Sequence, residues 1–322
     1  MMASRFVVAL ATVVLLWAAS AQAQIVSIGA NPPGNFTYSA NAAIAKVFNA
    51  KTGLEARVQP YGGSSAYVPL LDSGELDLAT LNAIETGMAV TGTGMFDGRK
   101  SPGVRAVTVL VPFVSAFFVK KDSPIRTVAD FKGRAIGSGY PSQTTLVPIT
   151  AALFANAGIT WNDVKQVPEP NNMRGADDFA AGKLDAFLFA LGSGKVQEID
   201  AQVGGVRAIG ISEAPDALAR MKKALPQGYP VIEHPSPVNT GVADRGAFMA
   251  YDMLIVASAK TSDEVVYKFV KTMHDSKPDL VAGFAALRAF EPDRMAKSLD
   301  PIEYHPGAVK FYREIGQWPP KG

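Results

Sequence analysis

Apolar positions along the chain follow two alternating spacings. Short apolar runs at 25–29, 54–60 and 76–81 predict β-strands, because runs of this length bounded by Gly, Pro or polar residues are typical of buried strands. Segments 37–52 and 65–72 instead carry apolar residues three and four positions apart, which predicts helices. Strands and helices in alternation predict an α/β fold with a mostly parallel sheet and right-handed crossovers.

The same succession of landmarks recurs 108 residues later in the chain. The matched landmarks are Ile28-Gly29 with Ile136-Gly137, Pro60 with Pro168, and Gly74-Glu75-Leu76-Asp77-Leu78 with Gly182-Lys183-Leu184-Asp185-Ala186. The second set predicts strands ending at 136 and covering 164–167 and 186–190, with helices at 144–157 and 176–181. Three landmarks in one register predict two similarly wound, Rossmann-like lobes with a ligand cleft between them.

Two longer strand-like segments, 114–120 and 249–257, lie between and after the repeats. We interpret them as two crossings between the lobes. Lobe one is then 24–114 with 256–322, and lobe two is 115–255. A sequential two-domain chain that divides near residue 120 is the alternative.

The first 23 residues have the pattern of an export leader. Arg5 gives the positive start, Phe6 to Ala19 is almost wholly apolar, and Ala21-Gln22-Ala23 is a cleavage signal. A retained membrane anchor is the alternative, although the apolar run is short for a span. We expect cleavage after Ala23, a mature chain that starts at Gln24, and a location in the periplasm. The chain contains no cysteine, which excludes disulfides and a thiol nucleophile.

Charge and residue usage argue against several classes of function. Without Arg5, 30 basic and 29 acidic residues remain, and no basic stripe suggests nucleic acid as a partner. His234, His274 and His305 are too far apart in the sequence for a local metal motif. We therefore expect no enzyme activity, no catalytic or metal-binding residues and no cofactor, and we expect a monomer.

Ligand contacts in open α/β sheets come from the loops after each strand. These loops are 30–38, 61–65, 82–85, 138–144, 170–174 and 190–194. The candidate ligand-binding residues in them are Asn31, Asn35, Phe36, Tyr38, Gly63, Ser64, Ser65, Asn82, Ser138, Tyr140, Ser142, Gln143, Thr144, Arg174 and Gly192. Several of the loops lead into helices, whose first N–H groups favour an anion.

Two of these predictions have structural alternatives. Arg174 can hold a carboxylate with two hydrogen bonds, but it can equally be a solvated Arg at a helix start. The hydroxyls near helix starts can be ordinary N-caps instead of ligand contacts. Asp77 and Asp185 occupy the same place in the repeat, which favours a structural role for both at a strand start.

Four segments resemble one receptor family. They are the loop Gly62-Gly63-Ser64 with Leu70 and 74–79, the segment Val128 to Arg134 before Ile136-Gly137, the leader, and the C-terminal run from Tyr304 to Gly316. Together they resemble the TAXI family of solute receptors for tripartite (TRAP) transporters. The resemblance implies a type II periplasmic binding protein fold, a ligand such as glutamate, 2-oxoglutarate or a related carboxylate, and a TRAP permease as partner. The sequence departs from the family pattern at Tyr67, Asn82 and Glu85.

These observations predict a periplasmic receptor that captures a small organic acid or amino acid by lobe closure. A receptor of the same fold that serves an ABC transporter, for an aromatic acid or a sulfonate, is the nearest alternative. A periplasmic enzyme or the ligand-binding partner of a sensor is the alternative from a different class.

Overall fold

The computed structural model describes residues 25–320, and the predicted leader and its cleavage site lie outside this range. The N-terminal part alternates strands and helices as expected. Its elements are β1 (Ile25–Ala30), α1 (Phe36–Thr52), β2 (Glu55–Pro60), α2 (Ser64–Ser73), β3 (Leu78–Asn82) and α3 (Ala83–Thr91). β1 pairs in parallel with both β2 and β3, so these three strands form one edge of the main sheet.

The middle of the chain repeats this winding. Its elements are β5 (Ala135–Gly139), α4 (Leu146–Asn156), β6 (Lys165–Glu169), α5 (Asn172–Ala180), β7 (Phe187–Ala190), α6 (Gly194–Val203), β8 (Val206–Ile209), α7 (Pro215–Ala224) and β9 (Tyr229–Glu233). β5 pairs in parallel with β6, and Ile136 bridges in parallel to Ala186 beside β7. These parallel contacts match those made by β1 in the first part.

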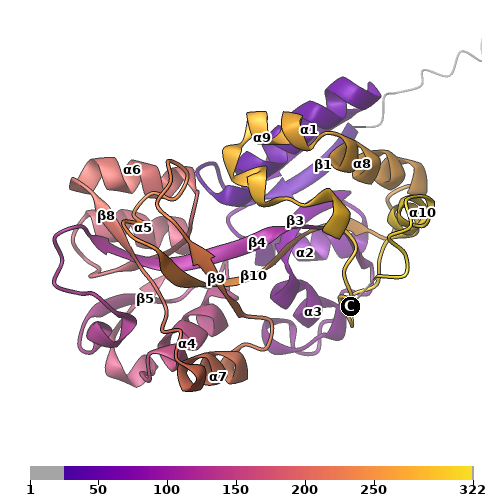
Figure 1. Cartoon of the computed structure of the whole chain (residues 1–322). Coiled ribbons are helices and arrows are strands. Elements are labelled where there is room, and N and C mark those ends of the chain that lie inside the picture. Colours follow the sequence, from indigo (N-terminus) through magenta and orange to yellow (C-terminus); the bar gives the residue numbers. More distant parts are fainter. Residues whose placement is uncertain (1–24, 321–322) are drawn as a thin grey trace, which may run out of the picture.

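Two long antiparallel strands, β4 (Val104–Lys120) and β10 (Gly246–Ser258), run through both lobes (Figure 1). At one end β10 pairs with β3, and at the other end it pairs with β9, while β4 continues to β7 and β8. β4 begins ten residues before the predicted crossing because its first part pairs with β10 inside lobe one.

The C-terminal helices return to the first lobe. They are α8 (Asp263–Asp275), α9 (Lys277–Gly283) and α10 (Pro306–Glu314). α8 and α9 pack on α1, and α10 packs on α8. The two-lobed α/β fold joined by two crossing strands is therefore confirmed, while the residue boundaries predicted for the lobes stay a prediction. The main sheet is mixed and not mostly parallel as expected, because the crossing strands β4 and β10 pair antiparallel with each other and with their other neighbours. No helix among the described residues is long and apolar enough to cross a membrane.

The repeat is visible in matching hydrogen bonds. The Asp77 carboxylate accepts hydrogen bonds from the backbone N–H of Ser27 at 2.8 Å and from its hydroxyl at 2.7 Å. At the equivalent place, the Asp185 carboxylate accepts from the backbone N–H of Ala135 at 2.8 Å. Each aspartate thus joins the strand that follows it to the first strand of its lobe, which is the structural role predicted from the sequence.

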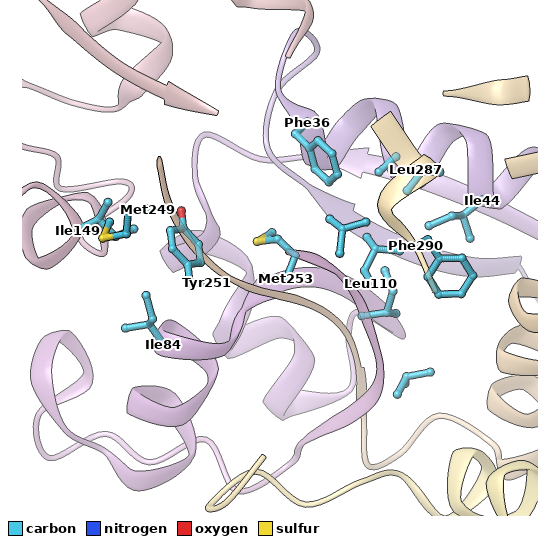
Figure 2. Packing of buried hydrophobic residues seen from close by; sticks show 14 of the residues in the cluster. Phe36, Ile44, Ile84, Leu110, Ile149, Met249, Tyr251, Met253, Leu287 and Phe290 are labelled. Atoms are coloured by element: carbon cyan, nitrogen blue, oxygen red, sulfur yellow. The ribbon is translucent and has the colours of Figure 1, made fainter. Parts of the chain in front are cut away.

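One hydrophobic cluster extends through both lobes along β10. Figure 2 shows Met249, Tyr251 and Met253 of this strand between Ile149 of the second lobe and Phe36 of the first. Alternate residues of a strand share one face, so these three side chains form a continuous row. The row connects the part of the core that contains Ile149 of α4 with the part that contains Phe36 of α1.

Candidate functional site

A cavity of about 60 Å³ lies between the two lobes. On this scale a water molecule needs about 10–15 Å³, so the cavity holds roughly four to six water-sized groups. Its polar lining comprises Asn31, Asn35, Thr37, Ser64, Thr80, Asn82, Glu85, Ser115, Gln143, Thr145 and Asn172. Its larger apolar and aromatic lining residues are Phe36, Tyr67, Leu81, Phe113, Leu146, Ile149, Leu188, Phe189, Tyr251 and Met253.

The lining follows the internal repeat. Six pairs of lining residues are separated by 108 positions: Asn35 and Gln143, Thr37 and Thr145, Ser64 and Asn172, Thr80 and Leu188, Leu81 and Phe189, and Asn82 and Ala190. Both lobes therefore contribute residues from equivalent positions of their shared winding, and these positions are strand ends and helix starts. This is the position where open α/β sheets bind ligands.

Five helices begin at the cavity. Phe36, Ser64, Leu146 and Asn172 are the first residues of α1, α2, α4 and α5, and Glu85 is in the first turn of α3. The N-cap side chains of α3 and α5 accept a hydrogen bond from the helix backbone. The N-cap residues of α1 and α2 make no such bond, so backbone N–H groups at these two helix starts are left for other partners. The start of α4 differs, because the N–H groups of Leu146 and Val147 donate to the carbonyls of Gln143 and Thr144, and residue 148 is a proline without an N–H.

The lobes contact each other around the cavity. Asn172 Nδ2 donates to Asn35 Oδ1 at 3.4 Å, and the backbone N–H of Lys195 donates to the carbonyl of Gly34 at 3.1 Å. Thr145 Oγ1 donates to Glu85 Oε2 at 3.5 Å. Contacts across the cleft from three sides indicate a closed arrangement of the lobes.

Gly63 marks the closest approach of the two lobes. A Cβ atom at this position would lie 1.7 Å from the carbonyl oxygen of Ser142. No side chain can be accommodated at that distance, so the closed arrangement depends on glycine at residue 63. Gly62 beside it has no atom within 4 Å of a comparable Cβ.

Glu85 is the charged group of the site. Its side chain is buried, with 0% exposure, and burial raises the pKa of the Glu85 carboxyl to about 7, while hydroxyl groups including those of Ser64 and Thr145 partly oppose this rise. Its Oε2 accepts from Asn82 Nδ2 at 3.4 Å, but its Oε1 has no hydrogen-bond partner among the described residues. A carboxyl that is both buried and half unpaired is a typical feature of a binding site.

Two further oxygen atoms at the cavity share this situation. Asn31 Oδ1 and Asn172 Oδ1 are buried and have no partner among residues 25–320. Both residues line the cavity with Glu85. In the described part of the chain, no Lys, Arg or His lines it, and Glu85 is its one acidic residue. The same range contains no group of three His, Cys, Asp or Glu side chains suited to a metal.

The structure places six of the predicted site residues at the cavity. They are Asn31, Asn35, Phe36, Ser64, Asn82 and Gln143. Thr37, Glu85, Thr145, Asn172 and the β10 residues Tyr251 and Met253 were missed. The spacing of 108 could have identified one of them, since Asn172 follows from Ser64, which was predicted.

The other predicted residues lie elsewhere. Ser65 and Thr144 line a separate groove beside α2, and Gly192 lines a second cavity next to Phe113. Gly63 and Ser142 form the close contact between the lobes, while Tyr38 is in the first turn of α1 and is not among its buried residues. Ser138 and Tyr140 are buried at the end of β5, where the backbone N–H of Tyr140 donates to the carbonyl of Glu169 at 2.9 Å. None of these residues lines the cavity.

Arg174 is also outside the cavity. Its guanidinium forms an ion pair with Asp178 at 2.9 Å, one helical turn further along α5, and its side chain is 52% exposed. The helix begins earlier than predicted because Asn171 Oδ1 accepts from the backbone N–H of Arg174 at 3.0 Å. Arg174 therefore occupies the first turn of a helix and not a loop that faces the ligand.

The fold and the cavity define the class: a two-lobed α/β protein with the periplasmic binding protein fold. Residues 28–316 match the NMT1-like family, and the chain belongs to this family. The structure is similar to PhnD1 from Prochlorococcus marinus in complex with methylphosphonate, with a TM-score of 0.57 and 12% identity over 91% of this chain and 98% of that one. A periplasmic transporter structure gives a TM-score of 0.57 with 14% identity, covering 92% of this chain and 94% of its own. The structure is also similar to AbpA from Streptococcus pneumoniae, an amino acid ABC transporter substrate-binding protein bound to L-arginine. The TM-score is 0.50, with 15% identity over 82% of this chain and 95% of that one.

These findings correct the resemblance drawn from the sequence. The matching family is the NMT1-like family and not the TAXI receptors, so the assignment to TAXI was wrong. The prediction of a TRAP permease as the partner, which followed from that resemblance, was therefore also wrong. Two residues that contributed to the resemblance, Gly74 at the end of α2 and Asp77 before β3, belong to the winding that both lobes repeat.

Proposed function

We propose that this protein is a periplasmic receptor of an ABC-type importer and that it captures a small polar solute by closure of its lobes. The observation that supports this most directly is the cavity, which both lobes line at equivalent positions. A ligand there contacts α1, α2 and α3 on one side and α4 and α5 on the other. Neither lobe alone forms a complete site, so binding and closure are one event.

The volume of the cavity limits the solute to a small molecule. Space for roughly four to six water-sized groups suits a molecule of the size of a small amino acid, sulfonate or phosphonate. An ABC importer as the partner is supported by the fold shared with AbpA, whose own description names an amino acid ABC transporter.

Binding is tested by thermal denaturation against a panel of amino acids, sulfonates, phosphonates and carboxylates. A ligand that binds only the closed, folded state adds about 2.7 kcal/mol of stability at 100 times its Kd. Small-angle scattering on the ligand-free protein and the complex then measures closure. A panel without any stabilising compound, or a ligand that leaves the radius of gyration unchanged, contradicts the receptor function.

Turnover separates the receptor from an enzyme. The bound compound is incubated with the protein and recovered by mass spectrometry, and we expect it unchanged. ATP-dependent uptake of the same compound by membrane vesicles supplied with the protein tests the ABC partner. Uptake that proceeds without ATP contradicts this partner but leaves the receptor function in place.

Export from the cytoplasm is part of the proposed function. We expect protein from the periplasmic fraction to start at Gln24, after the leader of residues 1–23. Mass spectrometry of the intact protein measures this directly. Full-length protein in the membrane fraction would contradict a periplasmic receptor.

A further inference from the structure

We infer that Glu85 selects the charge of the ligand and that the site takes a zwitterion, a solute whose protonated amine contacts Glu85 and whose anionic group contacts the helix starts. This inference rests on the proposed receptor function and specifies its ligand class as amino acids, aminosulfonates and aminophosphonates. The corresponding amine-free anions are excluded from the class.

The first reason is the uncompensated acid. Glu85 lies at 0% exposure in a cavity that has no Lys, Arg or His in its described lining. A buried carboxylate without a cation is unfavourable, and proteins pair such groups. Since no side chain at the cavity provides the positive charge, a ligand that carries it gains the most from this position.

The second reason is the arrangement of hydrogen-bond acceptors. Glu85 Oε1, Asn31 Oδ1 and Asn172 Oδ1 are buried without partners among the described residues and line one cavity. The side chain of Asn172 also donates from Nδ2 to Asn35 Oδ1 at 3.4 Å. An alkylammonium group has three N–H donors and no acceptor, which matches three acceptors from both lobes.

The third reason concerns the other end of the ligand. α1 and α2 begin at the cavity, and their N-cap residues Asn35 and Gly63 make no side-chain cap. Free N–H groups and the helix dipole at these starts favour a carboxylate, sulfonate or phosphonate. The cavity lining therefore combines the unpaired acceptor oxygens of Glu85, Asn31 and Asn172 with donor groups at two helix starts, which is complementary to a zwitterion.

Binding should consequently depend on the ionisation of Glu85. The titratable groups that face it are Tyr67 of α2 and Tyr251 of β10, and burial raises the pKa of both hydroxyls, so both stay neutral at physiological pH. Thr145, α4 and the end of β3 present no titratable side chain to it among the described residues. Burial raises the pKa of Glu85 itself to about 7. An ammonium binds the ionised form, so affinity rises with pH and levels off above 7, whereas a pure anion needs the protonated form and loses affinity above 7.

The test uses pairs of compounds that differ only in an amine or a hydroxyl. The pairs are alanine and lactate, and taurine and isethionate, each titrated by calorimetry. We expect one amino member to bind and its hydroxyl partner to bind about 30-fold more weakly or not at all, as for loss of a buried charge pair. Between pH 5.5 and 8 the affinity of the amino member should increase by roughly 30-fold, following the ionised fraction of a group with a pKa near 7.

Glu85→Gln is the critical variant, because it keeps the shape and an acceptor oxygen but removes the charge. We expect it to lose about 30-fold or more in affinity for the amino compound and to lose the pH dependence. Glu169→Gln is the matched control, since Glu169 is buried, has a pKa also raised to about 7, and lies outside the cavity. It should bind as the wild type does.

The outcomes separate the inference from the receptor function. Tight binding of a hydroxyl member, or affinity that falls above pH 7, overturns the inference but leaves the receptor function intact. The same holds if the wider panel yields a ligand without an amine. Should Glu85→Gln fail to fold, the compound pairs and the wild-type pH profile still decide. If no solute of any class binds, the receptor function itself fails.

Discussion

The two lobes have the same winding but provide different chemistry to the cavity. Lobe one presents Thr80 and Asn82 where lobe two presents Leu188 and Ala190, 108 residues later. The hydroxyl of Thr80 donates to Asn41 Oδ1 at 2.6 Å. The position in lobe two that is equivalent to Asn41 is the apolar Ile149. At these strand ends a polar, hydrogen-bonded wall of lobe one faces an apolar wall of lobe two, while the polar residues that lobe two adds to the cavity, Gln143, Thr145 and Asn172, come from its helix starts. The difference indicates that β3 of lobe one offers polar contacts to a ligand where β7 of lobe two offers an apolar surface.

The largest expected effect comes from a substitution that prevents closure of the two lobes. In Gly63→Ala the new Cβ would clash with the carbonyl of Ser142, which is 1.7 Å away in the closed arrangement. We expect ligand affinity to fall by a factor on the order of 10³, because apparent affinity declines with the population of the closed state. Calorimetry measures this, and scattering should show no compaction on ligand addition.

Gly62→Ala is the control for this variant. A Cβ at Gly62 meets no atom within 4 Å, so affinity should stay at the wild-type level. The backbone of Gly63 is extended, with φ of 176°, so alanine itself adds no backbone strain there. Normal binding by Gly63→Ala would show that the ligand does not require the closed contact.

A second comparison concerns one buried acid in each lobe. Burial raises the pKa of both Glu85 and Glu169 to about 7, and for Glu169 the nearby Asp178 contributes to the rise. A carboxyl with a pKa higher in the folded than in the unfolded chain binds more protons when folded, so ligand-free stability falls as pH rises from about 4.5 to about 7. We expect a loss on the order of 2–3 kcal/mol for each acid.

Denaturant unfolding at several pH values measures this loss. Glu85→Gln and Glu169→Gln should each flatten the decline over the same pH window, and the double variant should flatten it most. A decline that survives in the double variant would assign the pH dependence to other groups.

A smaller effect is expected for the two aspartates at equivalent positions of the lobes, which accept different numbers of hydrogen bonds. Asp77 accepts hydrogen bonds from both the backbone and the hydroxyl of Ser27, but Asp185 accepts from the backbone of Ala135 alone. We expect Asp77→Ala to cost about 2–3 kcal/mol of folding stability and Asp185→Ala about 1–1.5 kcal/mol, since unpaired buried donors are left behind. Equal losses in urea unfolding would show that the hydroxyl of Ser27 contributes nothing.

The smallest effect is expected for Arg174, the cation that the sequence suggested for the ligand. Its ion pair with Asp178 is half exposed, and it lies outside the cavity. Arg174→Ala should change ligand affinity by less than about 0.5 kcal/mol, as for other surface positions. Arg174→Lys provides the comparison, and a large loss with both would place this residue at the ligand after all.

The fold was predictable because its signals are local and repeated. Strand runs, helix periodicity and the aspartate at a fixed place in each lobe all lie in the sequence at one spacing. The site was predicted only in part, because the loops were identified correctly but not the direction of each side chain. Glu85 follows a buried strand within a short helix, where its burial depends on packing against the distant Thr145. Arg174 was expected in a loop, but Asn171 caps α5 so that Arg174 lies in its first turn. Its guanidinium therefore pairs with Asp178 of the same helix.

The pairing of β3 with β10 has a consequence for the order in which the molecule can be built. β3 ends at Asn82, yet its antiparallel neighbour begins at Gly246, after the whole second lobe has been synthesised. The N-terminal sheet therefore lacks a central strand while most of the chain emerges from the ribosome, and neither half reaches its final form alone. Contacts between residues so distant in sequence are formed slowly. The first lobe therefore stays without its central strand until β10 has been synthesised.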